Sequence, residues 1–171
     1  MVVRSVVRRS RLRELGVREA TFRATGAPVP VGATVDIPSD KSIKASVTFQ
    51  NTGSGTVSGH FTVAVMYADT LSDSSGNPEA DFQTWFGECD DWHAGESDLT
   101  LNPGASTTLE TGTTVPADQW TEGTTLDAGV VLVVTIGGTN YYLDSLKIDD
   151  AVKIIAPTMR VGITGVTFSE A

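Results

Sequence analysis

The sequence predicts an all-β protein whose antiparallel strands form a sandwich. From about residue 20 onward, short segments alternate apolar and polar residues, as strands with one buried face do. Turn-forming glycine, proline and asparagine residues separate these segments at roughly regular intervals. No segment in this region joins a helix-capping residue to apolar residues at a 3.6-residue period. About seven or eight short strands spaced in this way are typical of an antiparallel sandwich.

The first predicted hairpin joins residues 44–50 to residues 60–69 through a turn at 51–55, where Asn and Gly tolerate positive φ. Its strands are predicted to turn one set of apolar side chains inward: Ala45, Val47, Phe49, Phe61, Val63, Val65 and Tyr67. A second hairpin is predicted over residues 98–118, with an Asn-Pro-Gly turn, a threonine-rich return strand and Pro116 at its end.

The third predicted hairpin covers residues 127–148, with its loop at residues 137–140. Its first strand, residues 129–136, is apolar on both faces, so we expect it in the middle of a sheet. Residues 149–155 predict one further strand before Pro157.

Residues 69–98 depart from the pattern and are predicted to form a long loop, a feature that is usually functional or disordered. The segment contains Trp85, Phe86 and Trp92, which disfavours simple disorder. Together with Trp120, these aromatic residues could stack against a sugar ring, so a carbohydrate ligand for this loop is one interpretation. The other is that Trp85 and Trp92 anchor the loop to the sandwich or to a neighbour, while Trp120 covers an edge.

No set of residues predicts a catalytic or metal site. Cys89 and His93 lie four residues apart, but a structural zinc site normally needs four such ligands. The acids at positions 69, 73 and 81 do not have the spacing of a helix–loop–helix calcium site, which leaves only an irregular calcium loop as an alternative. His60 is predicted to be an ordinary surface residue, and Asp149 and Asp150 a solvated strand start. We therefore expect no catalytic residue, no cofactor and no enzymatic activity.

Charge divides the chain into a basic arm and an acidic body. Residues 1–23 contain seven arginines and two glutamates, whereas the rest contains five basic and nineteen acidic residues. We predict a basic N-terminal arm over residues 1–19, either as a short amphipathic helix or extended along a neighbour. Its partner-binding residues would be Arg4, Arg8, Arg9, Arg11 and Arg13. The arm should bind an anionic surface, and the acidic body argues against direct contact with nucleic acid.

The remaining composition limits the class of protein. A chain of 171 residues suits one domain with extensions, here a sandwich over residues 20–157. The single cysteine allows no internal disulfide, and no apolar run is long enough to span a membrane. Arginines interrupt the apolar residues at the N-terminus, so the sequence does not predict a secretory signal there.

Two segments near the two ends of the chain have similar sequences. Residues 15–22 read LGVREATF and residues 161–168 read VGITGVTF, with identical residues at three of the aligned positions. This likeness predicts that the C-terminal segment, residues 158–171, is an exchange strand that adds to the sheet edge of another subunit. The side chains that would enter that sheet are Val161, Ile163, and Val166 or Phe168.

A family resemblance rests on two turn motifs, Asn51-Thr52-Gly53 and Leu101-x-Pro103-Gly104-x-Ser106, each placed between strands. They resemble the immunoglobulin-like modules related to the bacterial cell-adhesion (CARDB-type) domain, over about residues 40–155. The resemblance implies an antiparallel immunoglobulin-like β-sandwich and says little about a site. Such modules occur in prokaryotic surface proteins, and similar ones decorate the heads and tails of tailed phages.

The basic arm, the lack of a signal pattern and the lack of a tandem array favour the second setting. We therefore expect a structural protein of a tailed-phage virion, a capsid decoration or a head or tail surface component. Its partners would be copies of itself and other virion proteins, with no membrane. The alternatives are a cell-surface adhesion or carbohydrate-binding module, or a subunit of a self-assembling extracellular filament.

Overall fold

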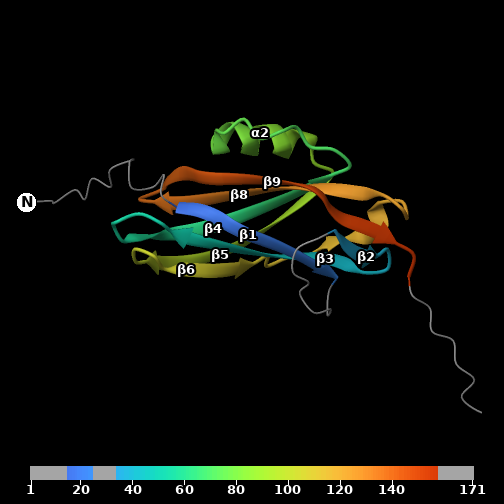
Figure 1. Cartoon of the computed structure of the whole chain (residues 1–171), viewed down its shortest axis with the longest axis horizontal. Coiled ribbons are helices and arrows are strands. Elements are labelled where there is room, and N and C mark those ends of the chain that lie inside the picture. Colours follow the sequence, from blue (N-terminus) through green and yellow to red (C-terminus); the bar gives the residue numbers. More distant parts are fainter. Residues whose placement is uncertain (1–14, 25–33, 158–171) are drawn as a thin grey trace, which may run out of the picture.

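A computed structural model describes residues 15–24 and 34–157 (Figure 1). The arginines predicted to bind a partner and the apolar residues of the predicted exchange strand lie outside the described residues. Neither helix in the described part of the chain is long and apolar enough to cross a membrane.

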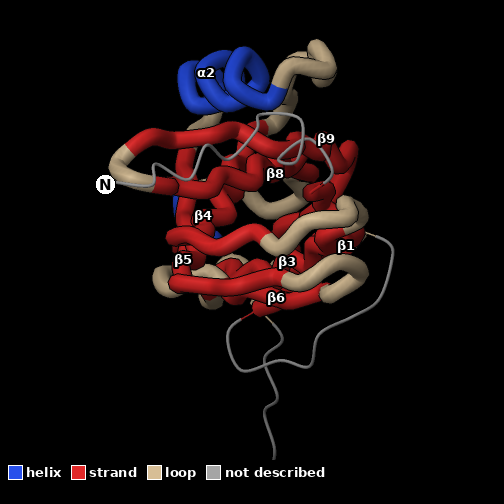
Figure 2. Tube along the Cα trace, turned by 90° about the vertical axis from the view of Figure 1, so that its left-hand side faces the viewer, coloured by secondary structure: helices blue, strands red, loops and turns tan. Residues whose placement is uncertain are grey.

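Two sheets face each other, and both are visible end-on in Figure 2. The four-stranded sheet has the order β1-β3-β6, with β7 paired to the end of β3; its strands are β1 (Leu15–Ala24), β3 (Ser42–Asn51), β6 (Ser106–Glu110) and β7 (Val115–Pro116). The five-stranded sheet has the order β2-β9-β8-β4-β5; its strands are β2 (Val35–Pro38), β9 (Thr139–Ile155), β8 (Thr125–Ile136), β4 (Val57–Ala68) and β5 (Asp91–Leu101). All pairs are antiparallel except β2 with β9.

This strand order is that of an immunoglobulin-like sandwich. β1, β3 and β6 occupy the places of strands A, B and E, and β4, β8 and β9 those of C, F and G. β5 extends the second sheet beside β4, as the additional strand of variable-type domains does. The predicted all-β sandwich is thus confirmed, and β8 lies between two partners as expected from its apolar sequence.

The core between the sheets consists of the side chains that alternate inward along each strand. All seven residues predicted to point inward from residues 44–50 and 60–69 are fully buried. Phe49 of β3 and Phe61 of β4 stack across the two sheets with ring centroids 5.6 Å apart. Each large buried side chain of this kind contributes about 2 to 3 kcal/mol by area.

Two of the predicted hairpins are wrong. β3 and β4 lie in different sheets, and so do β5 and β6, so both connections cross between the sheets. An alternating pattern identifies a strand but not its partner, which explains the error. The two crossings are held together by Asn51, which is fully buried. Its Nδ2 donates to the carbonyls of Gly55 (2.8 Å) and Leu101 (2.9 Å), and its Oδ1 accepts from the backbone N–H of Gly53 (3.0 Å).

The third predicted hairpin is confirmed. Ile136 pairs with Thr139, so β8 and β9 are joined by Gly137 and Gly138, both with positive φ. This is the twisted two-residue turn that matches the twist of the flanking strands. The predicted further strand at residues 149–155 is instead the continuation of β9, which bends at Asp150, where φ is 50°.

The prediction of a long loop at residues 69–98 is wrong in two places. Pro78–Glu88 form helix α2, and β5 begins at Asp91 instead of near residue 98. The helix begins with local signals: Asn77 caps it by accepting from the Glu79 N–H, and Pro78 occupies the first turn. A short 3-10 helix, Ala117–Gln119, follows β7. At the other end of the chain β1 begins at Leu15, so the sandwich starts before residue 20 and residues 15–19 are not part of the arm.

Candidate functional site

Helix α2 lies on the outer face of the five-stranded sheet, the face turned away from β1, β3 and β6 (Figure 1). It is attached by Trp85, which is fully buried. The indole Nε1 donates to the Ser72 carbonyl at 2.8 Å. The ring packs on Gly129 of β8, where a Cβ would come within 2.6 Å of it. Trp85 therefore anchors the segment and is not available to a ligand, which corrects one of the two predicted interpretations.

Trp85 is the centre of a second apolar cluster, separate from the core between the sheets. Its other members are Ala64, Met66, Ala68, Leu71, Val131 and Val133, and Cys89 packs against them. Burial raises the pKa of the Cys89 thiol, so Cys89 is a protonated packing residue at neutral pH.

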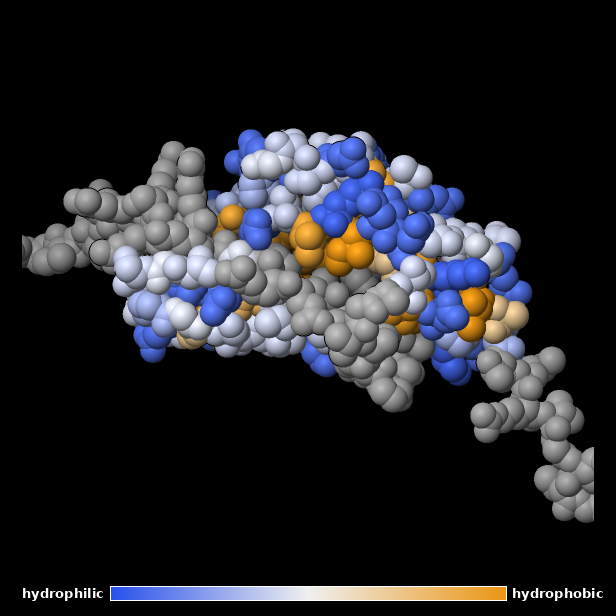
Figure 3. Space-filling model, in the orientation of Figure 1, coloured by the Kyte–Doolittle hydropathy of each residue, from blue (hydrophilic) through white to orange (hydrophobic). Residues whose placement is uncertain are grey.

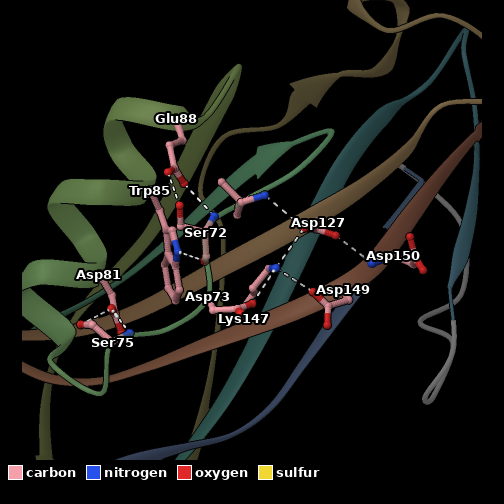
Figure 4. A network of polar contacts seen from close by, with 11 residues as sticks. Ser72, Asp73, Ser75, Asp81, Trp85, Glu88, Asp127, Lys147, Asp149 and Asp150 are labelled. Carbon is pink, nitrogen blue, oxygen red and sulfur yellow. Dashed lines mark hydrogen bonds and ion pairs between the residues drawn. The ribbon is translucent and has the colours of Figure 1, made fainter.

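Asp81 of α2 is buried and accepts four hydrogen bonds. Figure 4 shows it beside Ser75. The donors are the hydroxyls of Ser74 (2.5 Å), Ser75 (2.6 Å) and Ser145 (2.6 Å), and the Ser75 N–H (2.7 Å). Burial by itself raises the pKa of Asp81, but the hydrogen bonds outweigh it and lower the pKa to about 2. This carboxylate joins the loop before α2, the helix and β9, which is a structural role.

Lys147 of β9 lies under the same segment and contacts three carboxylates (Figure 4). Its Nζ is 2.8 Å from Asp149, 3.3 Å from Asp127 and 3.4 Å from Asp73. Hydrogen bonds and ion pairs with Asp149 and Asp127 raise the pKa of Lys147 above its usual range, although partial burial opposes this. Lys147 is thus a fixed positive charge that is already neutralised by its neighbours.

Asp127 fixes the start of the α2 segment to the sheet. Its two carboxylate oxygens accept the backbone N–H of Leu71 (3.1 Å) and of Asp150 (3.0 Å). Burial by itself raises the pKa of Asp127. The hydrogen bonds and the contact with Lys147 together have the larger effect and lower the pKa below its usual value, so the carboxylate is ionised. At the helix end, Glu88 accepts hydrogen bonds from the Ser72 hydroxyl and N–H. These carboxylates accept hydrogen bonds from the protein, which lower the pKa of each and attach the α2 segment to the sheet.

A row of aromatic rings runs along one side of α2. Phe82 stacks on Phe86 with centroids 5.7 Å apart and also meets Tyr142 of β9 at 5.5 Å. Phe86 meets Trp92 of β5 edge to face at 5.5 Å. Phe86 is 46% exposed and Trp92 is 44% exposed, and these are the large exposed hydrophobic residues of the described chain. Two of the three predicted aromatic site residues are thus brought together at the surface.

The surface around α2 is otherwise polar. In the view of Figure 3, hydrophilic residues cover the helix and its surroundings, and hydrophobic residues are visible in a patch beneath the helix.

An open hollow of about 580 Å³ adjoins Trp92 at the outer edge of β5. Trp92, His93, Ala94 and Glu96 line it from the strand, and Gly112 and Thr113 from the connection that follows β6. β5 is the last described strand of its sheet, so no other described strand pairs with its outward backbone groups. Here the Gly112 N–H covers one of them, the Ala94 carbonyl, at 2.8 Å.

His93 forms the inner wall of this hollow and is 2% exposed. Its Nε2 is 2.8 Å from the Tyr67 hydroxyl, but its Nδ1 is buried without a hydrogen-bond partner of normal geometry within the described residues. Burial lowers the pKa of His93 to about 4, although the Thr113 backbone and Asp91 act in the opposite direction. His93 is therefore neutral at physiological pH, and His93 and Tyr67 are not an ion pair.

Other candidates from the sequence do not form sites. His60 lies on the outer face, where the hydrogen bond with Asp98 raises its pKa. Trp120 is buried and its Nε1 donates to Asp90 at 3.1 Å. Within residues 15–24 and 34–157, no three His, Cys, Asp or Glu side chains are grouped so that they could hold a metal ion.

The sequence does not indicate that His93, Glu96 and the Thr113 backbone are neighbours of Trp92. The approach of residue 113 to β5 depends on the sheet crossing after β5, which no local pattern predicts. One local signal was present: Gly95 interrupts the strand, and a Cβ there would meet the Glu110 carbonyl oxygen at 2.3 Å. A glycine inside a strand often marks such a close backbone approach.

No known protein family and no curated protein matches the sequence. Among solved structures, the chain is similar to the C-terminal domain of wzt, with 9% identity and a TM-score of 0.46 over 92% of this chain and 84% of that chain. It is also similar to part of the β-glucuronidase of Bacteroides uniformis, with 10% identity and a TM-score of 0.42 over 78% of this chain. A β-glucosidase involved in saponin metabolism from intestinal bacteria gives 14% identity and a TM-score of 0.34 over 75% of this chain. The chain spans 14% and 16% of the two glycosidases, and these similarities concern the β-rich fold alone.

Proposed function

We propose that this protein is a non-enzymatic structural component of a tailed-phage virion, displayed on the head or tail and assembled through its two ends. One observation carries the proposal. β1 begins at one end of the elongated sandwich and β9 finishes at the opposite end (Figure 1). The basic segment before β1 and the apolar segment after β9 are therefore attached at opposite ends of one sandwich. Such a body can contact neighbours on two sides at once.

The polar clusters around α2 support a scaffolding role. Asp81, Asp127 and Lys147 are each engaged by several groups of the protein itself, so their charges stabilise the fold. Asn51 ties the Asn-Thr-Gly turn to the turn after β5, which are the two motifs of the CARDB-type resemblance. We infer that the chain is a module of that type, a class in which the fold serves as a display platform.

The C-terminal segment supplies the contact to a neighbouring copy. Val161, Ile163, and Val166 or Phe168 would enter a sheet edge, because strand addition satisfies the backbone groups of that edge and buries alternate side chains. Among the described strands, the edges of the sandwich are β1 on one side and β6 with β7 on the other side of one sheet, and β2 and β5 in the other sheet. An occupied edge is also protected from aggregation.

The test is removal of residues 158–171, followed by measurement of the oligomer mass and of retention on a particle. We expect a fall in oligomer mass without a change in the free energy of unfolding of the sandwich. Replacement of Thr164 and Gly165 by alanine is the matched control, because it keeps the apolar residues that would enter the sheet. An unchanged mass after the deletion would exclude strand exchange.

A carbohydrate-binding or cell-surface adhesion module is the second candidate, favoured by the exposed pair Phe86 and Trp92 beside an open hollow. It predicts binding to a glycan array that is lost in Trp92→Ala and kept in Trp85→Phe, since Trp85 is buried. Lack of glycan binding by the folded protein would remove this candidate. A self-assembling extracellular filament would share the exchange strand but would polymerise without any other protein.

A further inference from the structure

The exposed aromatic pair is the centre of a surface that we call the Trp92 face: Phe86, Trp92, Glu96 and the hollow that reaches His93 and Thr113. Three independent features mark it. Its two aromatic rings are nearly half exposed, the hollow lies on the outer edge of β5, the last described strand of its sheet, and the buried Nδ1 of His93 at its inner wall has only the Thr113 backbone beside it, without a regular hydrogen bond among the described residues. Exposed apolar groups beside unpaired polar groups are characteristic of a surface that is covered by a partner.

The negative charge around this surface indicates which kind of partner it would bind. Residues 69–98, which supply α2 and most of the Trp92 face, contain nine acidic residues and no lysine or arginine. Lys147 lies beside this segment but already contacts Asp73, Asp127 and Asp149. Residues 34–157 as a whole contain four lysines and eighteen acids, a net charge of 4 − 18 = −14. A partner should therefore be basic, with apolar side chains for Phe86 and Trp92.

The chain itself contains a segment of this composition. Residues 1–13 include five arginines and no acid, and they interleave the arginines with two valine pairs, Val2-Val3 and Val6-Val7. A peptide of this kind can set valines against the exposed rings while its arginines pair with carboxylates such as Glu96. Arginine also stacks favourably on the face of a tryptophan.

We propose that the N-terminal arm of one copy, residues 1–13, binds the Trp92 face of a neighbouring copy. This rests on the proposed function and names the receiving surface for the arm. A neighbouring copy is favoured over the arm's own body because β1 packs beside β9, whereas β5 is at the far edge of the sandwich beside β6. Leu15 pairs with Asn51, which contacts Leu101 at the end of β5, and Trp92 lies nine residues away along β5, or about 30 Å. Reaching the face of its own body would therefore use about nine extended residues before Leu15 and would leave only residues 1–5 to bind it.

A contact between two different surfaces of identical copies has a further consequence. It leaves one free arm and one free Trp92 face at the two ends of every assembly, so that growth continues until a ring closes. Association should therefore depend on concentration and should weaken with salt, because five arginines face an acidic surface.

The decisive experiment mixes two full-length variants and measures mass by analytical ultracentrifugation. The arm variant carries Arg4→Ala, Arg8→Ala, Arg9→Ala and Arg11→Ala, and the face variant carries Phe86→Ala and Trp92→Ala. The arm variant keeps an intact Trp92 face but has an altered arm, and the face variant keeps an intact arm but has an altered Trp92 face. Neither variant alone should therefore form the contact. The mixture should form a one-to-one heterodimer, because it combines an intact arm with an intact face. No heterodimer in the mixture would overturn binding between copies.

A peptide titration separates this contact from assembly through the C-terminal segment. A labelled peptide of residues 1–13 is titrated into the arm variant, and the affinity is read from fluorescence anisotropy. We expect Phe86→Ala with Trp92→Ala to weaken binding by at least about thirtyfold, as central aromatic residues of interfaces do. Glu96→Gln should weaken it a few-fold, and Glu122→Gln, which removes an exposed acid elsewhere, should not.

The outcomes distinguish this inference from the proposed function. A scrambled peptide that binds equally well, or binding unaffected by the face variant, would show only charge attraction and would overturn the Trp92 face as the receptor. Oligomers that persist in both variants and disappear on removal of residues 158–171 would refute the arm contact and leave the proposed assembly intact. A chain that stays monomeric in every form would refute both.

Discussion

The two faces of the five-stranded sheet are packed by different means. The inner face meets the other sheet mainly through apolar side chains, such as Phe61 stacked on Phe49, with a few buried polar contacts such as that between Tyr67 and His93. The outer face meets one helix through Trp85 and a small apolar cluster, and polar contacts at Asp81 and Asp127 hold the rest of the segment. The inner face therefore defines the fold, whereas the outer face carries an attachment that can fail independently.

The largest effect expected from this difference is that of Trp85→Ala. The substitution removes a fully buried ring and its hydrogen bond to Ser72, so the free energy of unfolding should fall by about 3 to 5 kcal/mol. Amide hydrogen exchange should show loss of protection in residues 78–88 while β4 and β8 stay protected. Phe61→Ala, the matched change on the inner face, should lower protection throughout the sandwich. Equal loss everywhere in Trp85→Ala would show that the faces are one cooperative unit.

A smaller effect is expected from Gly129→Ala, which adds one methyl group between the sheet and the helix. The new Cβ would lie 2.6 Å from the Trp85 ring, so the ring must move outward. We expect the free energy of unfolding, measured by urea titration, to fall by about 1 to 3 kcal/mol. The tryptophan fluorescence should shift to longer wavelength before the main unfolding transition. Gly87→Ala, where an added Cβ meets nothing within 4 Å, is the control. A loss of stability in the control as large as that of Gly129→Ala would contradict this explanation.

The acid dependence of stability should distinguish the polar attachment from the apolar core. The pKa of Asp81 is about 2 in the folded protein against 3.8 ordinarily, so folding favours its ionised form. Its contribution of about 2 kcal/mol is fully present above pH 4 and is lost as the pH falls toward 2. In Asp81→Asn this part of the pH dependence should be missing from urea titrations at successive pH values. An unchanged slope between pH 4 and pH 2 would mean that Asp81 is not the group responsible.

The smallest effect belongs to Trp92→Ala. Trp92 is nearly half exposed and contacts Phe86 only edge to face, so the free energy of unfolding should change by less than about 1 kcal/mol. The contrast with Trp85→Ala, measured in the same urea titration, tests whether one tryptophan serves the fold and the other a partner. A large loss of stability in Trp92→Ala would place both in the same structural role.

The sequence predicted the strands of the core because their period is set by one buried face. Ala45, Val47 and Phe49 alternate with polar residues, and any arrangement that buries them gives the same assignment. It did not predict which strands pair, since the crossings at Asn51 depend on contacts between residues 50 positions apart. It also missed α2, whose buried side includes a charged residue, Asp81, in place of a continuous apolar stripe. The candidate site was found only in its aromatic part, because Thr113 reaches Trp92 through the tertiary fold.

The position of α2 in the chain has a consequence for how such domains diversify. The segment leaves the sheet after Ala68 and returns at Asp91, yet Tyr67 and Asp91 are directly paired neighbours. A tight turn could join those two residues without moving either strand, so the helix is in effect a cassette inserted into a complete sandwich. Exchanging this cassette would leave Phe49, Phe61 and their neighbours in place and would present a different surface on an unchanged frame.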